Sequence, residues 1–414
     1  MTNPELHHFD YHGLMADHPP LHLKNIGQLT SFNPKTGRVE TISNTSLFIQ
    51  NGIIQRSSHF EYVIDCGGSL VTPGFIDPHT HPVFLNKRNK EFGLRLGGVT
   101  YQEIAAKGGG INSSIQGVRN ASKEELIKYV STRMDRFLKL GTTTVEAKSG
   151  YGLNTDSELK SLEVIHEVNS AHEIDIIPTF LGAHAFPPEY SDDHDGYVNL
   201  ICNEMIPKVA GQGIAVYCDI FCENGYFNLE QSRKIMETAI DNNLTPRFHA
   251  DEFEDSGAAE LAAEVRAISA DHLMAVSDIG LESMAKTNVM ATLLPGTTFF
   301  LGKNTYAPAK KILSKGIDIA LATDFNPGSC HIQSMPFIIS LACIFMGMKV
   351  EQAFASATYF SAKSLNLENE VGSISIGKKA DIIIWDIKEL IDIPYHITDL
   401  PIKMVIKNGK PIDS

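Results

Sequence analysis

Apolar runs alternate regularly with amphipathic segments along the middle of the chain. Eight runs rich in branched and aromatic residues lie at 74–79, 143–148, 175–183, 215–221, 245–250, 267–271, 289–294 and 318–323. Runs that are apolar at consecutive positions are typical of strands buried on both faces, and strand–helix alternation predicts a parallel sheet. Eight such units predict an α/β fold with a (β/α)8 TIM-type barrel over residues 73–367.

One amphipathic segment carries clear start and stop signals. Residues 123–140 place apolar side chains at three- and four-residue steps, which predicts a helix. Ser122 can cap its N-terminus, and Glu125, three residues later, would complete a capping box. Gly141 follows at the position of a left-handed C-cap residue. We therefore expect one continuous helix between the first and second barrel strands.

The two ends of the chain have a different pattern. Short strands separated by turn residues are expected in 21–72, including a hairpin at Asn51-Gly52. Further strands are expected at 373–376, 381–385 and 403–407. Neither end has enough strands to bury a face alone, so we expect residues 21–72 and 368–414 to form one small discontinuous β-sandwich domain. Residues 1–20 are rich in histidine and are predicted to be a flexible tail.

Composition and charge narrow the classes of protein that the chain can be. Its 414 residues, 43% hydrophobic and 20% charged, suffice for a barrel with an accessory domain. The net charge of −14 argues against nucleic acid or an anionic membrane as a partner, and no apolar run is long enough to cross a bilayer. Six scattered cysteines without a signal peptide favour reduced thiols and a cytoplasmic location.

Histidines follow several of the predicted barrel strands. The first strand ends in His79-Thr80-His81, and side chains alternate along a strand, so both imidazoles project to the same side. Later strand ends carry His184, His249, His272 and Asp324. Barrel enzymes place their chemistry at the carboxyl ends of the strands, and imidazole and carboxylate groups are preferred metal ligands. The pattern predicts a metal centre at this end of the barrel.

This arrangement of histidines and aspartate resembles the amidohydrolase superfamily. The segments Pro73-Gly74-Phe75-Ile76-Asp77 and Gly377-Lys378-Lys379-Ala380-Asp381-Ile382 are also typical of it. The resemblance implies a metal held by His79, His81, His249 and Asp324. Many members carry a carboxylated lysine on the fourth barrel strand that bridges two metals, but here that strand ends Ile220-Phe221-Cys222-Glu223. We therefore expect one metal ion per chain, Zn²⁺ or Fe³⁺, between which this ligand set does not distinguish.

Further segments are similar to those of superfamily members that open an imidazolone ring in histidine degradation. They are Asn86-Lys87-Arg88, Lys107-Gly108-Gly109-Gly110-Ile111, Glu146-Ala147-Lys148-Ser149-Gly150-Tyr151-Gly152, Gly182-Ala183-His184, His249-Ala250-Asp251-Glu252 and Asp324-Phe325-Asn326-Pro327-Gly328-Ser329. This similarity implies hydrolysis of the ring C–N amide bond of 4-imidazolone-5-propanoate to N-formimino-L-glutamate. The substrate contacts that it implies are Arg88, Tyr101, Tyr151, His184, Glu252 and Ser329. Asn326 and Gly328 would contact the product, together with Tyr151.

Residue chemistry gives expected roles to the polar groups around that metal. A bound metal lowers the pKa of its water to about 7, and Asp324 can accept the water's proton and later return it to the leaving nitrogen. His272 is placed to stabilise the oxyanion on the ring carbonyl. Glu252 could contact the ring nitrogens or deliver a proton. Arg88 suits the propionate, because a guanidinium binds a carboxylate with two parallel hydrogen bonds.

Other interpretations of these residues stay open at this point. Arg88 follows Lys87 and could be a surface cation, and Glu252 could be a solvated loop carboxylate. Another mononuclear amidohydrolase, such as a guanine- or cytosine-type aminohydrolase, would share the metal ligands without needing Arg88. A non-catalytic relative should have lost ligands, whereas every ligand position here is filled. A homodimer would be an ordinary assembly for a chain of this kind.

Overall fold

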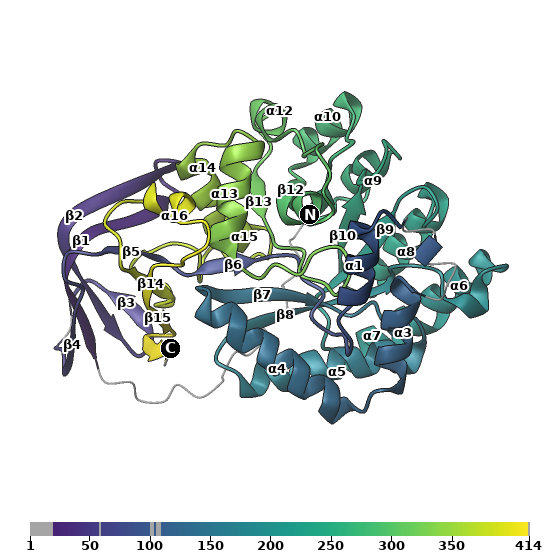
Figure 1. The fold of residues 1–414 in the computed structure, drawn as a ribbon, viewed down its shortest axis with the longest axis horizontal. Helices are drawn as coiled ribbons and strands as arrows, with labels where there is room; N and C mark the ends of the chain where they lie inside the picture. The colour runs from purple at the N-terminus through teal and green to yellow at the C-terminus, as the bar shows by residue number, and fades with distance from the viewer. Residues whose placement is uncertain (1–19, 58, 100–102, 105–108, 413–414) are drawn as a thin grey trace.

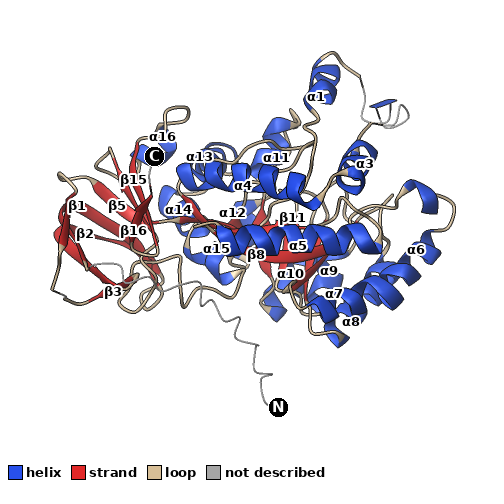
Figure 2. Cartoon of the chain, turned by 90° about the horizontal axis from the view of Figure 1, so that it is seen from below, coloured by secondary structure: helices blue, strands red, loops and turns tan. Residues whose placement is uncertain are grey.

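The computed structural model describes residues 20–57, 59–99, 103–104 and 109–412. Two sheets of eight strands each organise this part of the chain, and helices surround the parallel one (Figure 1, Figure 2). The histidine-rich residues 1–19 and Tyr101 lie outside the described residues, so the predictions made for them stay predictions.

Eight parallel strands form the barrel, in the hydrogen-bonded order β13-β12-β11-β10-β9-β8-β7-β6. They are β6 (Phe75–Asp77), β7 (Thr142–Lys148), β8 (Asp175–Ala183), β9 (Tyr217–Cys222), β10 (Thr245–Ala250), β11 (Ser269–His272), β12 (Met290–Leu293) and β13 (Ile319–Leu321). Each strand overlaps one of the eight apolar runs. Every residue of β7 and β9 is buried, as consecutive apolar positions predict. The predicted (β/α)8 barrel is confirmed.

Helices cover the outside of most of these strands, while α1 projects beyond the barrel and α16 lies beside the second sheet (Figure 2). They are α1 (Asn89–Leu96), α3 (Ile111–Asn120), α4 (Lys123–Lys139), α5 (Thr155–Ala171), α6 (His194–Leu200), α7 (Ile206–Gln212), α8 (Leu229–Asp241), α9 (Ala258–Glu264), α10 (Asp278–Thr287), α11 (Pro295–Phe300), α12 (Ala309–Ser314), α13 (Met335–Phe345), α14 (Val350–Ser356), α15 (Tyr359–Lys363) and α16 (Asp392–Tyr395). A 3₁₀ turn spans Pro188–Tyr190 and a π-helical turn spans Ile201–Met205. Within the described part of the chain, none of these helices has the length and apolar character that a membrane span requires.

Helix α4 begins and ends as its sequence predicts. The Ser122 hydroxyl accepts the Glu125 N–H at 3.2 Å, and the Glu125 carboxylate accepts the Ser122 N–H at 3.2 Å. This reciprocal capping box satisfies two backbone donors that the first helical turn leaves unpaired. Gly141 takes the predicted left-handed conformation, with φ of 87°. The apolar stripe that includes Leu126, Val130 and Phe137 is buried against the barrel.

The barrel closes beyond the ends of its first and last strands. The Asp324 N–H donates to the His79 carbonyl at 3.1 Å, and the His81 N–H donates to the Phe325 carbonyl at 2.8 Å. Thr80 and Phe325 form a parallel bridge at the same place. The backbone that joins β6 to β13 therefore carries three of the four candidate metal ligands.

The second sheet contains strands from both ends of the chain. Its order is β16-β15-β14-β5-β1-β2-β3, with β4 paired to β1. The strands are β1 (Leu21–Asn33), β2 (Arg38–Gln50), β3 (Ile53–Gln55), β4 (Tyr62–Asp65), β5 (Leu70–Pro73), β14 (Ile382–Trp385), β15 (Ile402–Lys407) and β16 (Lys410–Ile412). The two ends meet where β14 pairs antiparallel with β5. Because the long β1 pairs with both β4 and β5, hydrogen bonds join all eight strands into one mixed sheet.

The strand predicted at residues 373–376 does not form. Gly372 and Gly377 flank it with φ of 79° and 90°, so the backbone turns at both sides instead of staying extended. The Ile374 N–H donates to the Ser31 hydroxyl at 2.8 Å, a side-chain contact in place of a strand ladder. The predicted turn at Asn51-Gly52 does form, and both residues have positive φ.

Candidate active site

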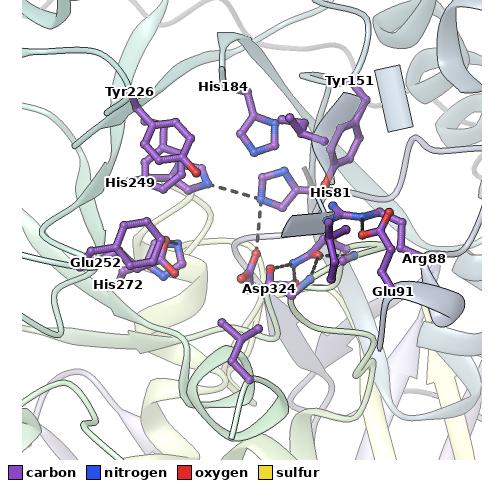
Figure 3. A pocket seen from close by; sticks show the side chains of 18 of the residues that line it. His81, Arg88, Glu91, Tyr151, His184, Tyr226, His249, Glu252, His272 and Asp324 are labelled. Atoms are coloured by element: carbon purple, nitrogen blue, oxygen red, sulfur yellow. Dashed lines mark hydrogen bonds and ion pairs between the residues drawn. The ribbon is translucent and has the colours of Figure 1, made fainter. Parts of the chain in front are cut away.

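The four predicted ligands converge at the carboxyl ends of the barrel strands. Nε2 of His81 lies 3.2 Å from Nε2 of His79, 3.4 Å from Nε2 of His249 and 3.4 Å from Oδ1 of Asp324. Figure 3 shows His81 between His249 and Asp324. All four side chains are buried. His272 lies beside them. One ring nitrogen from each of His79, His249 and His272 lies within 4.8 Å of the other two.

The chemistry of this donor set fits a metal ion. Nδ1 of His79 lies 2.6 Å from Oδ2 of Asp271, and Nδ1 of His249 lies 3.1 Å from Oδ1 of Asp219. A carboxylate oxygen only accepts, so in both rings Nδ1 carries a hydrogen, and the neutral ring presents its Nε2 lone pair to the cluster. Lone pairs that converge from several rings cannot satisfy one another, but a cation satisfies all of them. The cluster could therefore hold a metal.

Protonation of these rings follows from their surroundings. Burial lowers the pKa of His79 and of His81 well below the usual value, and neighbouring positive groups add to the effect. Burial also opposes the charged form of His249, but the charge of Asp219 outweighs it and raises the pKa of His249. At neutral pH His79 and His81 are neutral, the form that binds metals.

Charged side chains lie buried directly beneath the candidate ligands. The Lys148 ammonium is 2.8 Å from Oε1 of Glu146 and 2.7 Å from Oδ2 of Asp219. Burial acts against its charge, yet the two carboxylates raise the pKa of Lys148 above its usual value. The Arg247 guanidinium lies 3.6 Å from Oδ2 of Asp271, the carboxylate that holds His79. Sequence reasoning missed these residues. The sequence did carry a signal for them. An aspartate or lysine inside an apolar strand indicates a buried charge, and a buried charge needs a partner of opposite charge.

The backbone is unusual at three of the strand ends. Asp251, His272 and Asp324 all have positive φ, at 50°, 77° and 55°. Residues other than glycine adopt this region only where the surrounding structure holds them there, and such residues concentrate at functional sites. The conformation turns His272 and Asp324 into the mouth of the barrel, beside His81 and His249 (Figure 3).

A cavity of about 420 Å³ opens above the cluster. One wall is formed by Glu252 and His272, with Oε2 of Glu252 3.8 Å from Nε2 of His272. Burial, with the charge of Asp324, raises the pKa of Glu252 to about 8, and burial lowers the pKa of His272 to about 3. Neither ring nitrogen of His272 has a hydrogen-bond partner among the described residues. Both groups are therefore neutral hydrogen-bonding groups at the cavity wall.

Arg88 lines the same cavity from the other side (Figure 3). Its Nε donates to Oε2 of Glu91 at 2.8 Å, and only about a tenth of its side chain is exposed. The guanidinium packs on Gly328, where an added Cβ would lie 2.3 Å from Nη1 of Arg88. Arg88 is therefore a largely buried cation at the cavity and not an exposed surface residue.

Asn326 shapes the loop that carries Gly328 and Ser329. Its side-chain oxygen accepts the N–H groups of Gly328 at 2.8 Å and Ser329 at 2.7 Å, and its amide nitrogen donates to the Ser329 hydroxyl at 2.8 Å. All three residues line the cavity. The amide of Asn326 is thus engaged in holding the loop.

Tyr151 and His184 also line the cavity, next to His81. Nδ1 of His184 donates to the Gly150 carbonyl at 2.8 Å, and its ring stacks on His81 with centroids 5.1 Å apart. The buried carboxylate of Glu158 accepts three N–H groups of the loop around Tyr151, those of Gly150, Gly152 and Leu153. The substrate contact predicted at Tyr101 lies outside the described residues.

Several residues of the cavity were not predicted. Aromatic side chains form a further wall, where Phe221 and Tyr226 stack with centroids 4.1 Å apart and the Lys303 ammonium lies 4.7 Å from the centre of the Phe253 ring. The other unpredicted lining residues are Glu91, Arg95, Ile104, Ile111 and Leu301. They come from loops and short helices whose position over the barrel has no local sequence signal.

Comparison with known proteins agrees with this architecture. A family model described as Amidohydrolase family matches residues 228–412. A 5-methylcytosine deaminase from Klebsiella pneumoniae, liganded with phosphonocytosine, superposes with a TM-score of 0.74 over 95% of this chain and 98% of its own, at 16% identity. An adenosine deaminase from Xanthomonas campestris with bound zinc has a TM-score of 0.69 over 94% of this chain and 92% of its own, also at 16% identity. At such identity the likeness shows a shared fold.

Sequence relatives are much more similar. An imidazolonepropionase from Brevibacillus brevis is 45% identical over 388 residues, which cover 91% of this chain and 91% of that protein. Another from Alkaliphilus metalliredigens is 47% identical over 84% of this chain and 82% of its own. Identity at this level over nearly the full length of both proteins shows that the chain belongs to the imidazolonepropionase family of the amidohydrolases.

Proposed function

We propose that this protein hydrolyses the ring C–N amide bond of 4-imidazolone-5-propanoate to N-formimino-L-glutamate. The observation that carries the proposal is 45% identity over 91% of the chain to a protein named imidazolonepropionase. The cavity supports it, because a buried histidine–aspartate cluster and an arginine face the same space. That combination suits a small planar amide with a carboxylate tail.

The proposed metal is a single ion, Zn²⁺ or Fe³⁺, held by His79, His81, His249 and Asp324. When bound, it would lower the pKa of a water molecule and polarise the ring carbonyl. Glu223, at the end of the fourth barrel strand, turns its carboxylate to the N–H groups of Phe253 at 3.0 Å and Asn224 at 3.2 Å. That orientation supports one metal ion, since no bridging group then comes from the fourth strand.

Asp324 is the proposed acceptor of the water's proton. Its Oδ2 accepts the Thr297 hydroxyl at 2.5 Å, which fixes the carboxylate, while Oδ1 faces His81 at 3.4 Å and His79 at 3.7 Å. A carboxylate held in this way can take a proton on the side of the cluster and pass it to the departing ring nitrogen.

His272 and Glu252 are the proposed groups at the reacting carbonyl and nitrogen. A neutral His272 can donate one ring N–H to the carbonyl oxygen as negative charge develops there. Glu252 stays largely protonated at neutral pH, because its pKa is raised to about 8, so it can donate to a ring nitrogen. Both groups then contribute without first changing their protonation state.

Arg88 is the proposed partner of the propionate. Its guanidinium is held by Glu91 on the Nε side and by Gly328 beneath, so little side-chain entropy is lost when it binds a carboxylate. Arg95 supports the same loop, since its Nη2 donates to the Gly328 carbonyl at 3.0 Å. Fixing the tail at this end would place the ring over the cluster.

The proposal is tested by comparing substrates on the metal-loaded protein. We expect hydrolysis of 4-imidazolone-5-propanoate with a kcat/KM at least about a thousandfold above that for guanine or cytosine, because only the first carries a carboxylate for Arg88. Asp324→Asn, which keeps the size of the side chain but removes the proton acceptor, is the inactive control. Turnover of guanine or cytosine with 4-imidazolone-5-propanoate untouched would contradict the proposal in favour of an aminohydrolase.

A further inference from the structure

We propose that Lys148 is a positioning residue of the metal centre, which fixes two carboxylates that in turn orient three of the four ligands. The inference rests on the proposed function, since it assigns a role toward the proposed metal. Lys148 ends β7, beneath the cluster, and its side chain is completely buried together with those of Glu146 and Asp219.

The first carboxylate, Asp219, connects Lys148 to the ligand on β10. Oδ2 of Asp219 lies 2.7 Å from the ammonium, while Oδ1 lies 3.1 Å from Nδ1 of His249. The two oxygens of one carboxylate therefore have different partners, and rotation of the group would break both contacts. With Asp219 fixed, the imidazole of His249 is held with Nε2 directed at the cluster.

The second carboxylate, Glu146, connects Lys148 to the ligand pair after β6. Oε1 of Glu146 lies 2.8 Å from the ammonium, and Oε2 accepts the N–H of Thr80 at 3.2 Å. Thr80 separates the two ligands His79 and His81. Its hydroxyl donates to the Glu146 carbonyl at 2.6 Å, and its carbonyl accepts the Lys148 N–H at 3.0 Å. The backbone between the two histidines is thus held on three sides.

The positive charge is what keeps this arrangement together. Among the described residues, Lys148 is the only lysine or arginine in ion-pair contact with either Glu146 or Asp219. Two buried carboxylates that lose a shared counter-charge repel each other and carry a large desolvation cost. At least one of them would turn away, and the ligand that it orients would lose its direction.

The chain offers a matched control at a distance from the site. Lys407, on β15 of the second sheet, is equally buried, and its ammonium lies 2.8 Å from Asp175 and 2.7 Å from Asp381. Lys407→Met and Lys148→Met thus remove the same group from the same kind of two-carboxylate setting. A purely structural loss should affect both variants alike.

The experiment measures the dissociation constant for Zn²⁺ by competition with a chromophoric chelator, on the folded fraction of wild type, Lys148→Met and Lys407→Met. We expect binding to weaken by about 10- to 100-fold in Lys148→Met, the usual effect of losing an outer partner of a ligand, and by less than about threefold in Lys407→Met. In the Zn²⁺-saturated Lys148→Met, kcat should fall while KM stays near the wild-type value, because Arg88 is untouched. Zn²⁺ affinity equal to wild type, or equal losses in both variants, would overturn the proposal.

Asp219→Asn covers the case in which Lys148→Met does not fold. It keeps the shape of the side chain and removes the charge between Lys148 and His249, so Zn²⁺ binding should again weaken by about 10-fold or more. Unchanged Zn²⁺ affinity in Asp219→Asn would overturn the proposal as well. Failure of the proposed function is a separate result, because it would appear in the wild type as absent Zn²⁺ binding or absent hydrolysis.

Discussion

At the scale of single residues, the cavity wall is determined by how closely Arg88 and Gly328 approach each other. A Cβ at position 328 would lie 2.3 Å from Nη1 and 2.6 Å from Cζ of Arg88, so any other residue there must displace the guanidinium. Glu91 holds the opposite side of the same group at 2.8 Å. The proposed carboxylate site is therefore built before substrate arrives, which is the arrangement expected of a binding group and not of a mobile surface arginine.

Removing the guanidinium should separate binding from metal retention. Arg88→Ala is expected to lower kcat/KM for 4-imidazolone-5-propanoate by about two to four orders of magnitude, as for a lost charged contact. Metal content should stay at the wild-type level, because Arg88 touches none of the ligands. Arg233→Ala, which breaks an exposed ion pair with Glu264, is the surface control and should leave both values unchanged. An unaffected kcat/KM in Arg88→Ala would show that this arginine does not hold the substrate.

The protonation of Glu252 predicts the alkaline side of the pH profile. Burial raises its pKa to about 8, so the carboxyl group is protonated below that pH and loses its proton as pH rises through it. If Glu252 donates a proton, kcat should fall as pH rises, with a midpoint at or below about 8, because a bound cation would lower the pKa. In Glu252→Gln, kcat should fall by about 10²–10⁴ and this limb should disappear. If kcat of Glu252→Gln still fell with the same midpoint as pH rises, the fall would belong to another group.

At the scale of elements, the sequence predicted those helices and strands whose positions depend on local patterns. The eight barrel strands and the ends of α4 follow from runs, spacing and caps within a few residues. The strand expected at 373–376 failed because two glycines with positive φ flank it, a conformation that an apolar pattern does not report. The barrel pattern predicted that the strand-end histidines and Asp324 would gather at one mouth. The choice of His79, His81, His249 and Asp324 among them as ligands came from the family resemblance and stays a prediction.

The partners of those ligands could not be chosen in advance. Asp219 reaches His249 because β9 lies next to β10, and Asp271 reaches His79 across the barrel. Such contacts depend on which strands are neighbours and on their register, and both are determined only when the barrel closes. The aromatic wall of Phe221, Tyr226 and Phe253 has the same origin.

The cap of α4 gives a prediction at this scale. Ser122→Ala removes the acceptor of the Glu125 N–H, and loss of such a cap should lower the free energy of unfolding by about 1 kcal/mol. Activity should be unchanged, because the cap lies on the outside of the barrel. Denaturant unfolding, with kcat/KM measured on the same sample, tests both statements. A loss of activity at full stability would contradict the structural role given to this serine.

At the scale of the whole molecule, the proposed ligands His79, His81 and Asp324 lie where the barrel closes, and the second sheet packs against the start of the same strand β6. The Asp324 N–H and the His79 carbonyl join the last strand to the first at 3.1 Å. From the second sheet, the buried Trp385 donates its indole N–H to Thr72 at 2.9 Å and packs edge-on against Phe75 at the start of β6. Metal binding at this seam should therefore stabilise the fold as well as provide chemistry.

Metal stoichiometry tests the proposed single-ion centre. Elemental analysis of protein lacking residues 1–20 should find close to one equivalent per chain, and removal of the ion by a chelator should abolish hydrolysis and lower Tm. Truncation avoids counting ions bound by the histidines of that segment. Two tightly bound equivalents would replace the single-ion centre with a binuclear one.

If water opens the ring amide, the product formed in H₂¹⁸O must carry the label. Metal-loaded protein and 4-imidazolone-5-propanoate should give a product heavier than the substrate by one water. A single turnover should place one ¹⁸O in the newly formed carboxylate, with no ammonia released. Release of ammonia with the ring intact, or a ring-opened product without ¹⁸O, would contradict hydrolytic opening of the ring amide.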